Sequence, residues 1–197
     1  MLQSIAYILH IHVYITHINH HYSVQDRFCM ASTHRIRIDF ICVHNAGRSQ
    51  MAAAFAERER AERGLEDIVE IHSGGTDPAD AVHEEVIEAM SEVGIDLTDR
   101  SPKYVASLDQ LKESHYLITM GCSLAKFNPA QYGVESRSWD LTKPDGQDME
   151  TVREVRDDIE LQVQTLFDEV ERTVKERQAS RDSSRGIVGS IRDALSL

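Results

Sequence analysis

The candidate chemistry of this chain lies in the segment CVHNAGRS, in which Cys42 and Arg48 are separated by five residues. A loop of that length can turn successive backbone N–H groups toward one tetrahedral oxyanion, and a helix that follows it adds the positive end of its dipole. The planar guanidinium of Arg48 can hold two oxygens of the same anion. The spacing therefore predicts an oxyanion-binding loop made of Val43, His44, Asn45, Ala46, Gly47, Arg48 and Ser49.

Cys42 is the candidate nucleophile of this loop. A thiol at the mouth of a positively charged nest is expected to be present largely as the thiolate, and Ser49 is placed to donate a hydrogen bond to the sulfur. His44, if protonated, would favour the thiolate further. A nucleophile aimed at a bound oxyanion can catalyse phosphoryl or arsenyl chemistry. The alternative is that Cys42 is a buried structural cysteine in a strand-to-helix turn.

The segments on either side of the loop have the patterns that this chemistry requires. Residues 35–43 form an apolar, β-branched run that predicts a buried strand. Residues 47–63 predict an alanine-rich helix with Met51, Ala54 and Phe55 on one face. The loop is therefore expected to join the carboxyl end of a strand to the start of a helix.

Strands and helices alternate along the rest of the chain. This alternation predicts an α/β fold with a parallel four-stranded sheet flanked by helices. Ligands of such folds bind at the carboxyl ends of the strands, and both Cys42 and Cys122 follow a predicted strand. After the first helix, the predicted strands are residues 67–73, 115–121 and about 136–141, and the predicted helices are residues 81–93, 106–113 and about 148–175.

Three regions of the chain differ in composition. Residues 1–33 form an N-terminal extension that holds half of the ten histidines but only one acid and one base. We expect this extension to be disordered or to result from a start upstream of Met30, and its histidines fix no metal geometry. Residues 34–176 hold the predicted domain. Residues 177–197 form a polar tail that is expected to be disordered, with at most a weak helix over residues 187–197.

The charge of the chain excludes some partners. The sequence has 33 acidic and 21 basic residues, of which five are lysine, and a formal net charge of −12. No basic stripe is available to displace counterions, so no nucleic-acid partner is expected. The apolar run near the N-terminus is too interrupted by His and Asn to span a bilayer, so no membrane association is expected. An acid-rich, lysine-poor surface is typical of a protein that works in concentrated salt.

The cysteine content indicates the redox compartment. Cys29, Cys42 and Cys122 are too few for a disulfide scaffold, and a nucleophilic thiol has to stay reduced. This predicts a cytoplasmic protein. No bound metal or cofactor is predicted.

Five segments resemble the low-molecular-weight protein-tyrosine-phosphatase superfamily, and within it the arsenate reductase branch. In that family Cys42 would be the nucleophile, Arg48 the oxyanion clamp and Asn45 a brace of the loop. The resemblance implies reduction of arsenate to arsenite with an external thiol donor, which is thioredoxin, a glutaredoxin or a low-molecular-weight thiol. The segments are CVHNAGRSQMA (42–52), SGGTDPA (73–79), EVGIDLTDRSPK (92–103), LITMGCS (117–123) and WDLTKPDGQDMETVREVRDDIE (139–160).

Lys143 is the first departure from this family, because relatives usually carry an aspartate there, immediately before the proline. In the family's phosphatases that aspartate protonates the leaving group. A tyrosine phenolate, with an unperturbed pKa of about 10, needs such an acid, which is commonly worth about 10²–10⁴-fold. Arsenate loses only hydroxide or water and brings its own protons. The departure therefore favours the reductase, although Asp140 or Asp145 could substitute as the acid.

Two further departures concern the substrate ring and the cysteine relay. The small polar sequence DGQD follows Pro144, where tyrosine phosphatases of this kind place aromatic residues. Cys122 matches the first relay cysteine, but Asn128 stands before Pro129 where thioredoxin-linked relatives have the second. Two routes are compatible with these residues. In one, Cys42 and Cys122 form a disulfide, and in the other, an external thiol resolves an arsenate adduct of Cys42. Cys122 could also be a buried cysteine without chemistry.

Two other functions fit the same residues. One is hydrolysis of phosphotyrosine or a small phosphate ester through a cysteinyl-phosphate, and the other is a non-catalytic oxyanion or redox sensor. Steady release of phosphate from an aryl phosphate would favour the first, and anion binding without turnover would favour the second. Outside the loop, His72 and His83 are expected to cap a helix or face solvent, and Trp139 to pack the loop onto the sheet.

Overall fold

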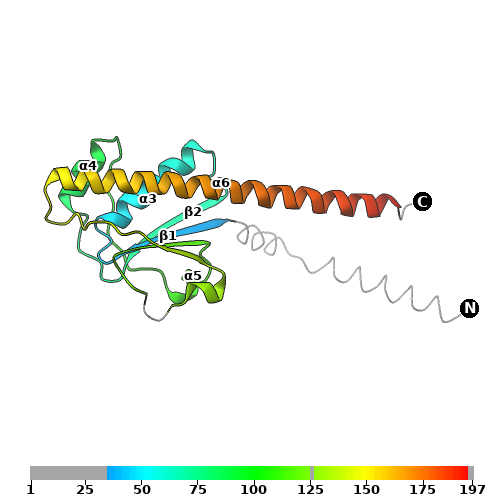
Figure 1. Cartoon of the computed structure of the whole chain (residues 1–197), viewed down its shortest axis with the longest axis horizontal. Helices are drawn as coiled ribbons and strands as arrows, with labels where there is room; N and C mark the ends of the chain where they lie inside the picture. Colours follow the sequence, from blue (N-terminus) through cyan, green and yellow to red (C-terminus); the bar gives the residue numbers. More distant parts are fainter. Residues whose placement is uncertain (1–34, 125–126, 195–197) are drawn as a thin grey trace, which may run out of the picture. The chain divides into compact units, whose positions relative to one another are not determined.

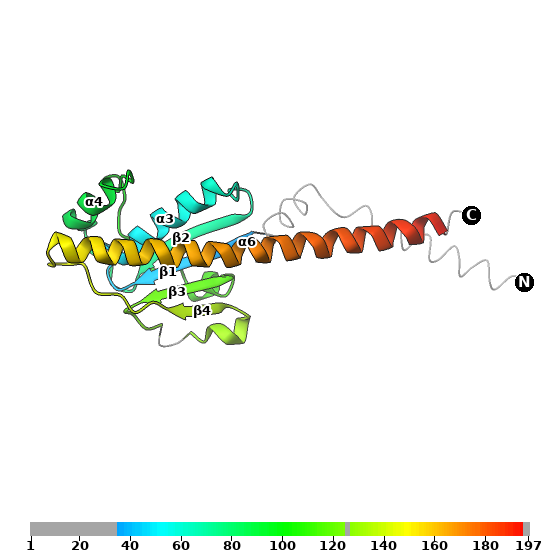
Figure 2. The ribbon, with the colours of Figure 1, turned by 45° about the horizontal axis from the view of Figure 1, so that its top comes forward.

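The computed structural model describes residues 35–124 and 127–194. The chain divides into Met1–Arg35 and Ile36–Leu197, and the second unit holds the fold described below. It contains a four-stranded parallel sheet with strand order β2-β1-β3-β4 (Figures 1 and 2), which confirms the predicted fold class. The predictions for residues 1–34, which include Cys29, lie outside the described residues. The strands are β1 (Ile36–Cys42), β2 (Val69–Gly75), β3 (Tyr116–Met120) and β4 (Glu135–Ser138).

Helices cover both faces of this sheet. Helices α3, α4 and α6 lie on one face and α5 lies on the other (Figures 1 and 2). In the described part of the chain, none of the helices combines the length and the apolar character needed to cross a bilayer. The helices are α3 (Arg48–Glu62), α4 (Glu84–Ser91), α5 (Leu108–Leu111) and α6 (Met149–Ala194), with a short 3-10 turn, η1 (Pro129–Tyr132).

Strand β1 lies at the centre of the sheet, between β2 and β3. Its apolar run is explained by burial on both faces: Ile38 and Phe40 pack under α3 and α6, whereas Ile41 packs with Leu111 of α5. Trp139 joins the larger core and meets the Phe40 ring at 5.8 Å between centroids. Because the chain leaves β1 for β2 on one side and later returns to β3 on the other, the end of β1 is the topological switch point, where such sheets bind ligands.

Helix α6 is longer than the sequence analysis predicts. The predicted helix ends near residue 175 and is followed by a disordered tail, but residues 176–194 continue the helix to Ala194. The prediction of disorder was wrong for residues 177–186 because it rested on polar composition, and the weak helix expected from residue 187 is part of α6 as far as Ala194. The segment has no proline, and its Arg, Gln, Ala and Ser residues tolerate a helix, so Gly186 and Gly189 are its weakest positions.

Ion pairs join α3 to α6 above the sheet. Arg58 pairs with Glu160, and Arg63 pairs with Asp168 at 2.7 Å. The Arg63 guanidinium also lies over the Phe167 ring, 5.9 Å from its centroid. Pairs of this exposure each contribute little, so the contact between the two helices depends mainly on the apolar residues buried beneath them.

The imidazole of His115 should make stability depend on pH. Burial lowers the pKa of His115, and its Nδ1 accepts a hydrogen bond from the Arg37 backbone N–H at 3.1 Å. An unfolded His titrates near pH 6.5, so below that pH the unfolded state takes up the proton more readily. We expect the free energy of unfolding to be unaffected by this group above about pH 7 and to fall as the pH drops below about 6.5.

Denaturant midpoints measured across this pH range test the effect, with His115→Asn as the matched control. The asparagine oxygen is bonded to Cγ, as Nδ1 is, so it can accept the same backbone hydrogen bond, and it does not titrate. The control should therefore lose less stability on acidification than the native chain. An equal loss in both proteins would contradict the assignment.

The net charge of −12 should make stability depend on salt. Like charges on the folded surface repel one another, and KCl screens them over about 10 Å at 0.1 M but about 3 Å at 1 M. We expect the melting temperature to rise by several degrees between these two concentrations. Sorbitol, which does not screen charge, serves as the control solute. A melting temperature that is highest at low salt would contradict this expectation.

Candidate oxyanion site

The loop between β1 and α3 is held from outside by the segment that follows β2. Four of its carbonyl groups accept hydrogen bonds from backbone N–H groups of residues 76–83. Carbonyl groups that point outward are what an anion-binding nest requires, since its amides have to face the inside of the loop. The bonds run from Thr76 to Cys42 (3.2 Å), Asp77 to Val43 (2.9 Å), Ala79 to His44 (3.0 Å) and His83 to Ala46 (3.0 Å).

The sulfur of Cys42 has two hydrogen-bonding neighbours in the loop. The Asn45 backbone N–H donates to Sγ at 3.2 Å, and Ser49 Oγ lies 3.0 Å from Sγ. Asn45 Nδ2 donates to the same Ser49 oxygen at 2.8 Å. Since Ser49 accepts from Asn45, its own O–H is available to donate to the sulfur. These hydrogen bonds fix the position of the sulfur within the loop.

Asn45 holds the shape of the loop. Its backbone is in the left-handed region, with φ of 49°, a conformation that Asn tolerates better than most residues. Its side-chain oxygen accepts from the Lys103 backbone N–H at 2.9 Å, and its backbone carbonyl accepts from Gln50 Nε2 at 3.0 Å. Asn45 is fully buried, so these bonds compete little with water and fix the loop in one conformation.

Arg48 is the first residue of α3, and its guanidinium lies across the end of the neighbouring strand. Nη1 donates to the Leu141 carbonyl at 3.0 Å. The guanidinium also rests on Gly121, which follows β3 with φ of 68°. A Cβ atom at Gly121 would stand 2.8 Å from Nη1. A residue without a side chain is therefore needed there for Arg48 to reach its position.

Replacement of Gly121 by alanine should displace this guanidinium. We expect Gly121→Ala to weaken the binding of inorganic phosphate at least about tenfold, because the charge-assisted hydrogen bonds of Arg48 would be lost. Calorimetric titration with phosphate measures the affinity, and thermal unfolding reports the strain of alanine at positive φ, about 1–2 kcal/mol. Gly133→Ala is the matched control, because Gly133 has φ of 70° and open space around it. Equal affinities in the two variants would contradict the role of Gly121.

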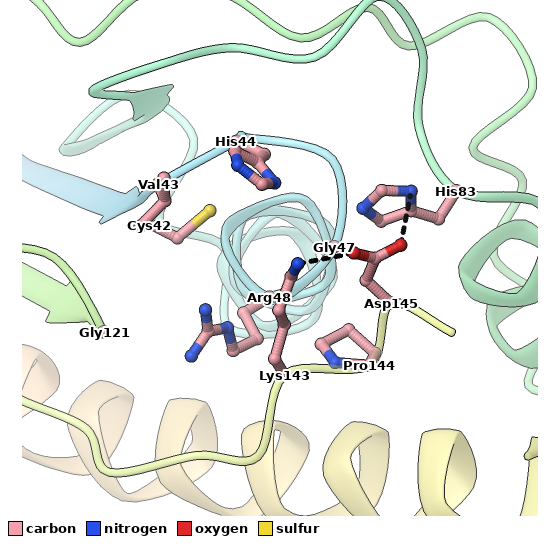
Figure 3. Close-up of a pocket in the computed structure, with 10 residues that line it drawn as sticks. All are labelled: Cys42, Val43, His44, Gly47, Arg48, His83, Gly121, Lys143, Pro144 and Asp145. Atoms are coloured by element: carbon pink, nitrogen blue, oxygen red, sulfur yellow. Dashed lines mark ion pairs between the residues drawn. The ribbon is translucent and has the colours of Figure 1, made fainter. Parts of the chain in front are cut away.

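The loop opens into a cavity of about 280 Å³ at the carboxyl end of β1 (Figure 3). This volume leaves ample room for a tetrahedral anion beside Cys42 and Arg48. Figure 3 shows Cys42 Sγ, the Arg48 guanidinium and Lys143 around one hollow. The cavity is lined by Cys42, Val43, His44, Gly47, Arg48, His83, Gly121, Lys143, Pro144 and Asp145.

Lys143 and Asp145 form an ion pair in the wall of this cavity, with 2.5 Å between Nζ and Oδ2. The hydrogen bond from Lys143 is the main cause that lowers the pKa of Asp145, and the charge of His83 adds to it. Asp145 is therefore ionised at neutral pH and holds no proton to donate. Asp140, the other acid considered as a proton donor, is exposed and is not among the residues that line the cavity.

His83 is a cavity residue that the sequence analysis assigned to a helix cap or to solvent. It stands at the N-cap position of α4, and its Nδ1 lies 3.8 Å from Asp145 Oδ1. Its backbone N–H donates to the Ala46 carbonyl of the loop, and its side chain points toward Asp145 (Figure 3). No local pattern in the sequence signals this contact, which joins residues almost forty positions apart in the chain.

His83, Glu85 and Asp145 are also a possible set of metal ligands, with their ligand atoms within 4.8 Å of one another. The ammonium group of Lys143 already lies 2.5 Å from the Asp145 carboxylate. A cation would have to compete with the ammonium group for this carboxylate, so the cluster is not assigned as a metal centre.

Cys122 lies just past the end of β3, beside the cavity. Cys42 and Cys122 are both free thiols. Burial is the main cause that raises the pKa of Cys122, and its Sγ lies 3.5 Å from the Ile41 carbonyl, to which it donates. Cys122 is therefore mostly a neutral thiol at pH 7. Asn128, at the position of the second relay cysteine, precedes η1.

A parallel sheet with a Cys-x5-Arg nest at its switch point defines a class of enzymes that attack a bound oxyanion with a thiolate. The family model of the low molecular weight phosphotyrosine protein phosphatases matches residues 37–177, and the chain belongs to this family. This assignment confirms the resemblance seen in the sequence.

Three members of the family that are similar to this chain carry names that refer to arsenate reduction. A Halobacterium salinarum protein that carries the provisional name arsenate reductase is 54% identical over 140 residues, covering 71% of this chain and 96% of the relative. The arsenate reductase of Staphylococcus aureus strain Newman is 31% identical over 131 residues, which cover 66% of this chain and 94% of the relative. The solved structure of the thioredoxin-dependent arsenate reductase of Corynebacterium glutamicum matches with a TM-score of 0.57 and 30% identity. The match covers 76% of this chain and 72% of the relative.

Proposed function

We propose that this chain is an arsenate reductase in which the thiolate of Cys42 is the nucleophile and an external thiol supplies the electrons. The composition of the cavity wall carries the proposal. The groups that bind and attack a tetrahedral anion are present, whereas the acid in the wall, Asp145, is kept ionised by Lys143. Such a site favours a substrate whose leaving group needs no proton from the protein.

In the first step, Cys42 Sγ attacks the arsenic atom of bound arsenate. A sulfur–arsenic bond forms, the bond from arsenic to its protonated oxygen breaks, and that oxygen leaves as hydroxide with the proton that the anion already carries. Arg48 and the inward-facing amides hold the remaining oxygens and their negative charge. The Asn45 backbone N–H and Ser49 hold the sulfur in the line of attack.

In the second step, an external thiolate attacks Cys42 Sγ. The sulfur–arsenic bond breaks, and its electron pair goes to arsenic, so that arsenic(V) becomes arsenic(III) and leaves as arsenite. A mixed disulfide between Cys42 and the donor is left behind. A second thiol reduces this disulfide, so that two thiols become one disulfide for each arsenite formed.

Cys122 is the internal alternative to the external thiol. Burial raises its pKa, which lowers the fraction of thiolate that could attack Cys42 at neutral pH. Its thiol is also turned toward the Ile41 carbonyl. Both observations favour an external donor. Because the C. glutamicum relative is named thioredoxin-dependent, thioredoxin is the first donor to try, followed by glutaredoxin and low-molecular-weight thiols.

We place the reaction in the cytoplasm, where thiols are kept reduced. The nucleophile of this chemistry is inactive as a disulfide, and Cys42 and Cys122 are free thiols. The donor classes considered above are also those of a reducing compartment.

A paired assay in concentrated KCl tests the proposal. One arm offers arsenate with each of the three classes of thiol donor and measures arsenite, and the other offers an aryl phosphate and measures phosphate release. We expect arsenite formation with at least one donor and little hydrolysis of the ester. Sustained phosphate release without arsenite would instead identify a phosphatase, the function in the family's name. Anion binding without turnover in either arm would identify a sensor.

A further inference from the structure

The segment that carries Lys143 is fixed to the oxyanion loop on both sides. Before it, the Leu141 carbonyl accepts a hydrogen bond from Arg48 Nη1 at 3.0 Å. After it, Pro144 packs on Gly47 so closely that a Cβ atom there would stand 2.8 Å from Pro144 Cγ. The backbone of Lys143 is therefore held at the mouth of the cavity, and its side chain is the part that can move.

The side chain of Lys143 is bound to Asp145 but remains half exposed. Its relative exposure is 50%, and that of Asp145 is 40%. The pair lies beside the Arg48 guanidinium, with the Lys143 ammonium directed at Asp145 (Figure 3). An exposed pair of this kind gains little from its geometry. A rotation of the lysine therefore costs little if another anion competes for the ammonium group.

A bound oxyanion is such a competitor. Among the groups that line the cavity, Arg48 and Lys143 carry positive charge, and Asp145 and the thiolate form of Cys42 carry negative charge. The Asp145 carboxylate repels an incoming anion, whereas the Lys143 ammonium group attracts it. The attraction scales with the charge of the anion, so a doubly charged anion gains about twice as much as a singly charged one.

We propose that Lys143 determines the charge specificity of this site: it turns from Asp145 to the bound oxyanion and makes the cavity prefer doubly charged over singly charged tetrahedral anions. The inference rests on the proposed function in naming the oxyanion as the substrate. It adds that the substrate class is the doubly charged inorganic anion, and that Asp145 holds the lysine when the cavity is empty.

Anion binding by Cys42→Ser tests this role without any turnover. Sulfate and perchlorate are both tetrahedral and fully ionised but differ in charge, and their affinities can be measured by calorimetry at constant KCl. Lys143→Met should weaken sulfate binding about tenfold and perchlorate binding about threefold or less, by the charge scaling of the Coulomb attraction. Lys175→Met, which removes an exposed lysine from the far part of α6, is the matched control and should change neither affinity.

Asp145→Asn tests the second half of the inference. Loss of the carboxylate should release Lys143 and tighten sulfate binding several-fold, and this gain should shrink markedly when Lys143→Met is also present. A double-mutant cycle measures that coupling. A gain of the same size in both backgrounds would mean that Asp145 acts only by repulsion, and would overturn the release of Lys143.

The results separate this inference from the proposed function. If neither sulfate nor perchlorate binds the Cys42→Ser chain, the oxyanion site itself is refuted and the reductase with it. If both bind and Lys143→Met changes their affinities equally or not at all, Lys143 has no part in charge selection, whereas the reductase stands. A selective loss of sulfate affinity supports the inference.

Discussion

Cys42→Ser should abolish arsenite formation, with a loss of at least about 10⁴-fold, the scale seen when a nucleophile is removed. A serine hydroxyl is not ionised at neutral pH and is therefore a poor nucleophile toward arsenic. If serine did attack, arsenic would be bonded to oxygen, and the external thiol would have no sulfur atom with which to form a disulfide. The change removes both the attacking atom and the atom that is oxidised. Arsenite measured with saturating thiol donor is the readout.

Binding should survive this substitution, which distinguishes a lost nucleophile from a lost site. Arg48 and the loop amides are unchanged in Cys42→Ser, and the fully buried Asn45 still braces the loop. Phosphate affinity should therefore stay within a few-fold of the native value. Cys122→Ser is the comparison, and it should retain arsenite formation with an external thiol. Arsenite formation by Cys42→Ser at a rate near that of the native chain would refute the mechanism.

Lys143→Asp should convert the site toward ester hydrolysis, with a rise of about 10²-fold or more in kcat for an aryl phosphate. The introduced carboxyl would stand two residues from the ionised Asp145. Two neighbouring carboxylates raise the pKa of one of them, so one would hold a proton near neutral pH. A positioned acid of this kind is commonly worth about 10²–10⁴-fold.

Charge repulsion in Lys143→Asp opposes this gain, but it acts on KM rather than on kcat. A second carboxylate at the cavity mouth weakens the binding of the phosphate dianion, so KM should rise by about tenfold. Since kcat gains more than KM loses, the variant should still be the better phosphatase. Lys143→Asn, which removes the lysine without adding an acid, is the control and should gain no hydrolysis. If both variants hydrolyse the ester equally, the effect is not proton donation.

The sequence predicts the framework of the site because its signals are local. The apolar run before Cys42 indicates a strand buried on both faces, and Arg48 to Glu62 indicate the helix that follows it. The position of Cys42 and Arg48 in a strand–loop–helix unit follows from their neighbours alone. The alternation of elements is enough to order the chain into a parallel sheet.

The cavity wall could not be predicted, because it depends on contacts between distant segments. The outward turn of the loop carbonyls depends on residues 76–83, and the position of Lys143 depends on Pro144 packing against Gly47. The approach of His83 to Asp145 is not visible in the sequence, because the two residues lie in distant segments, one at the start of α4 and the other before α6. The local pattern around His83 indicates only a helix cap or a solvent-exposed side chain. Helix α6 was predicted too short because polar composition does not mark a helix end without a breaking residue.

The most direct test of the central claim is the ratio of arsenite formed to Cys42 oxidised in a single turnover. The fully reduced chain is mixed with arsenate and a limiting amount of a small thiol, arsenite is quantified, and the intact protein and its peptides are weighed by mass spectrometry. We predict one arsenite for each Cys42 that becomes a mixed disulfide, with Cys122 still a free thiol. Arsenite formed while Cys42 stays reduced would contradict the account.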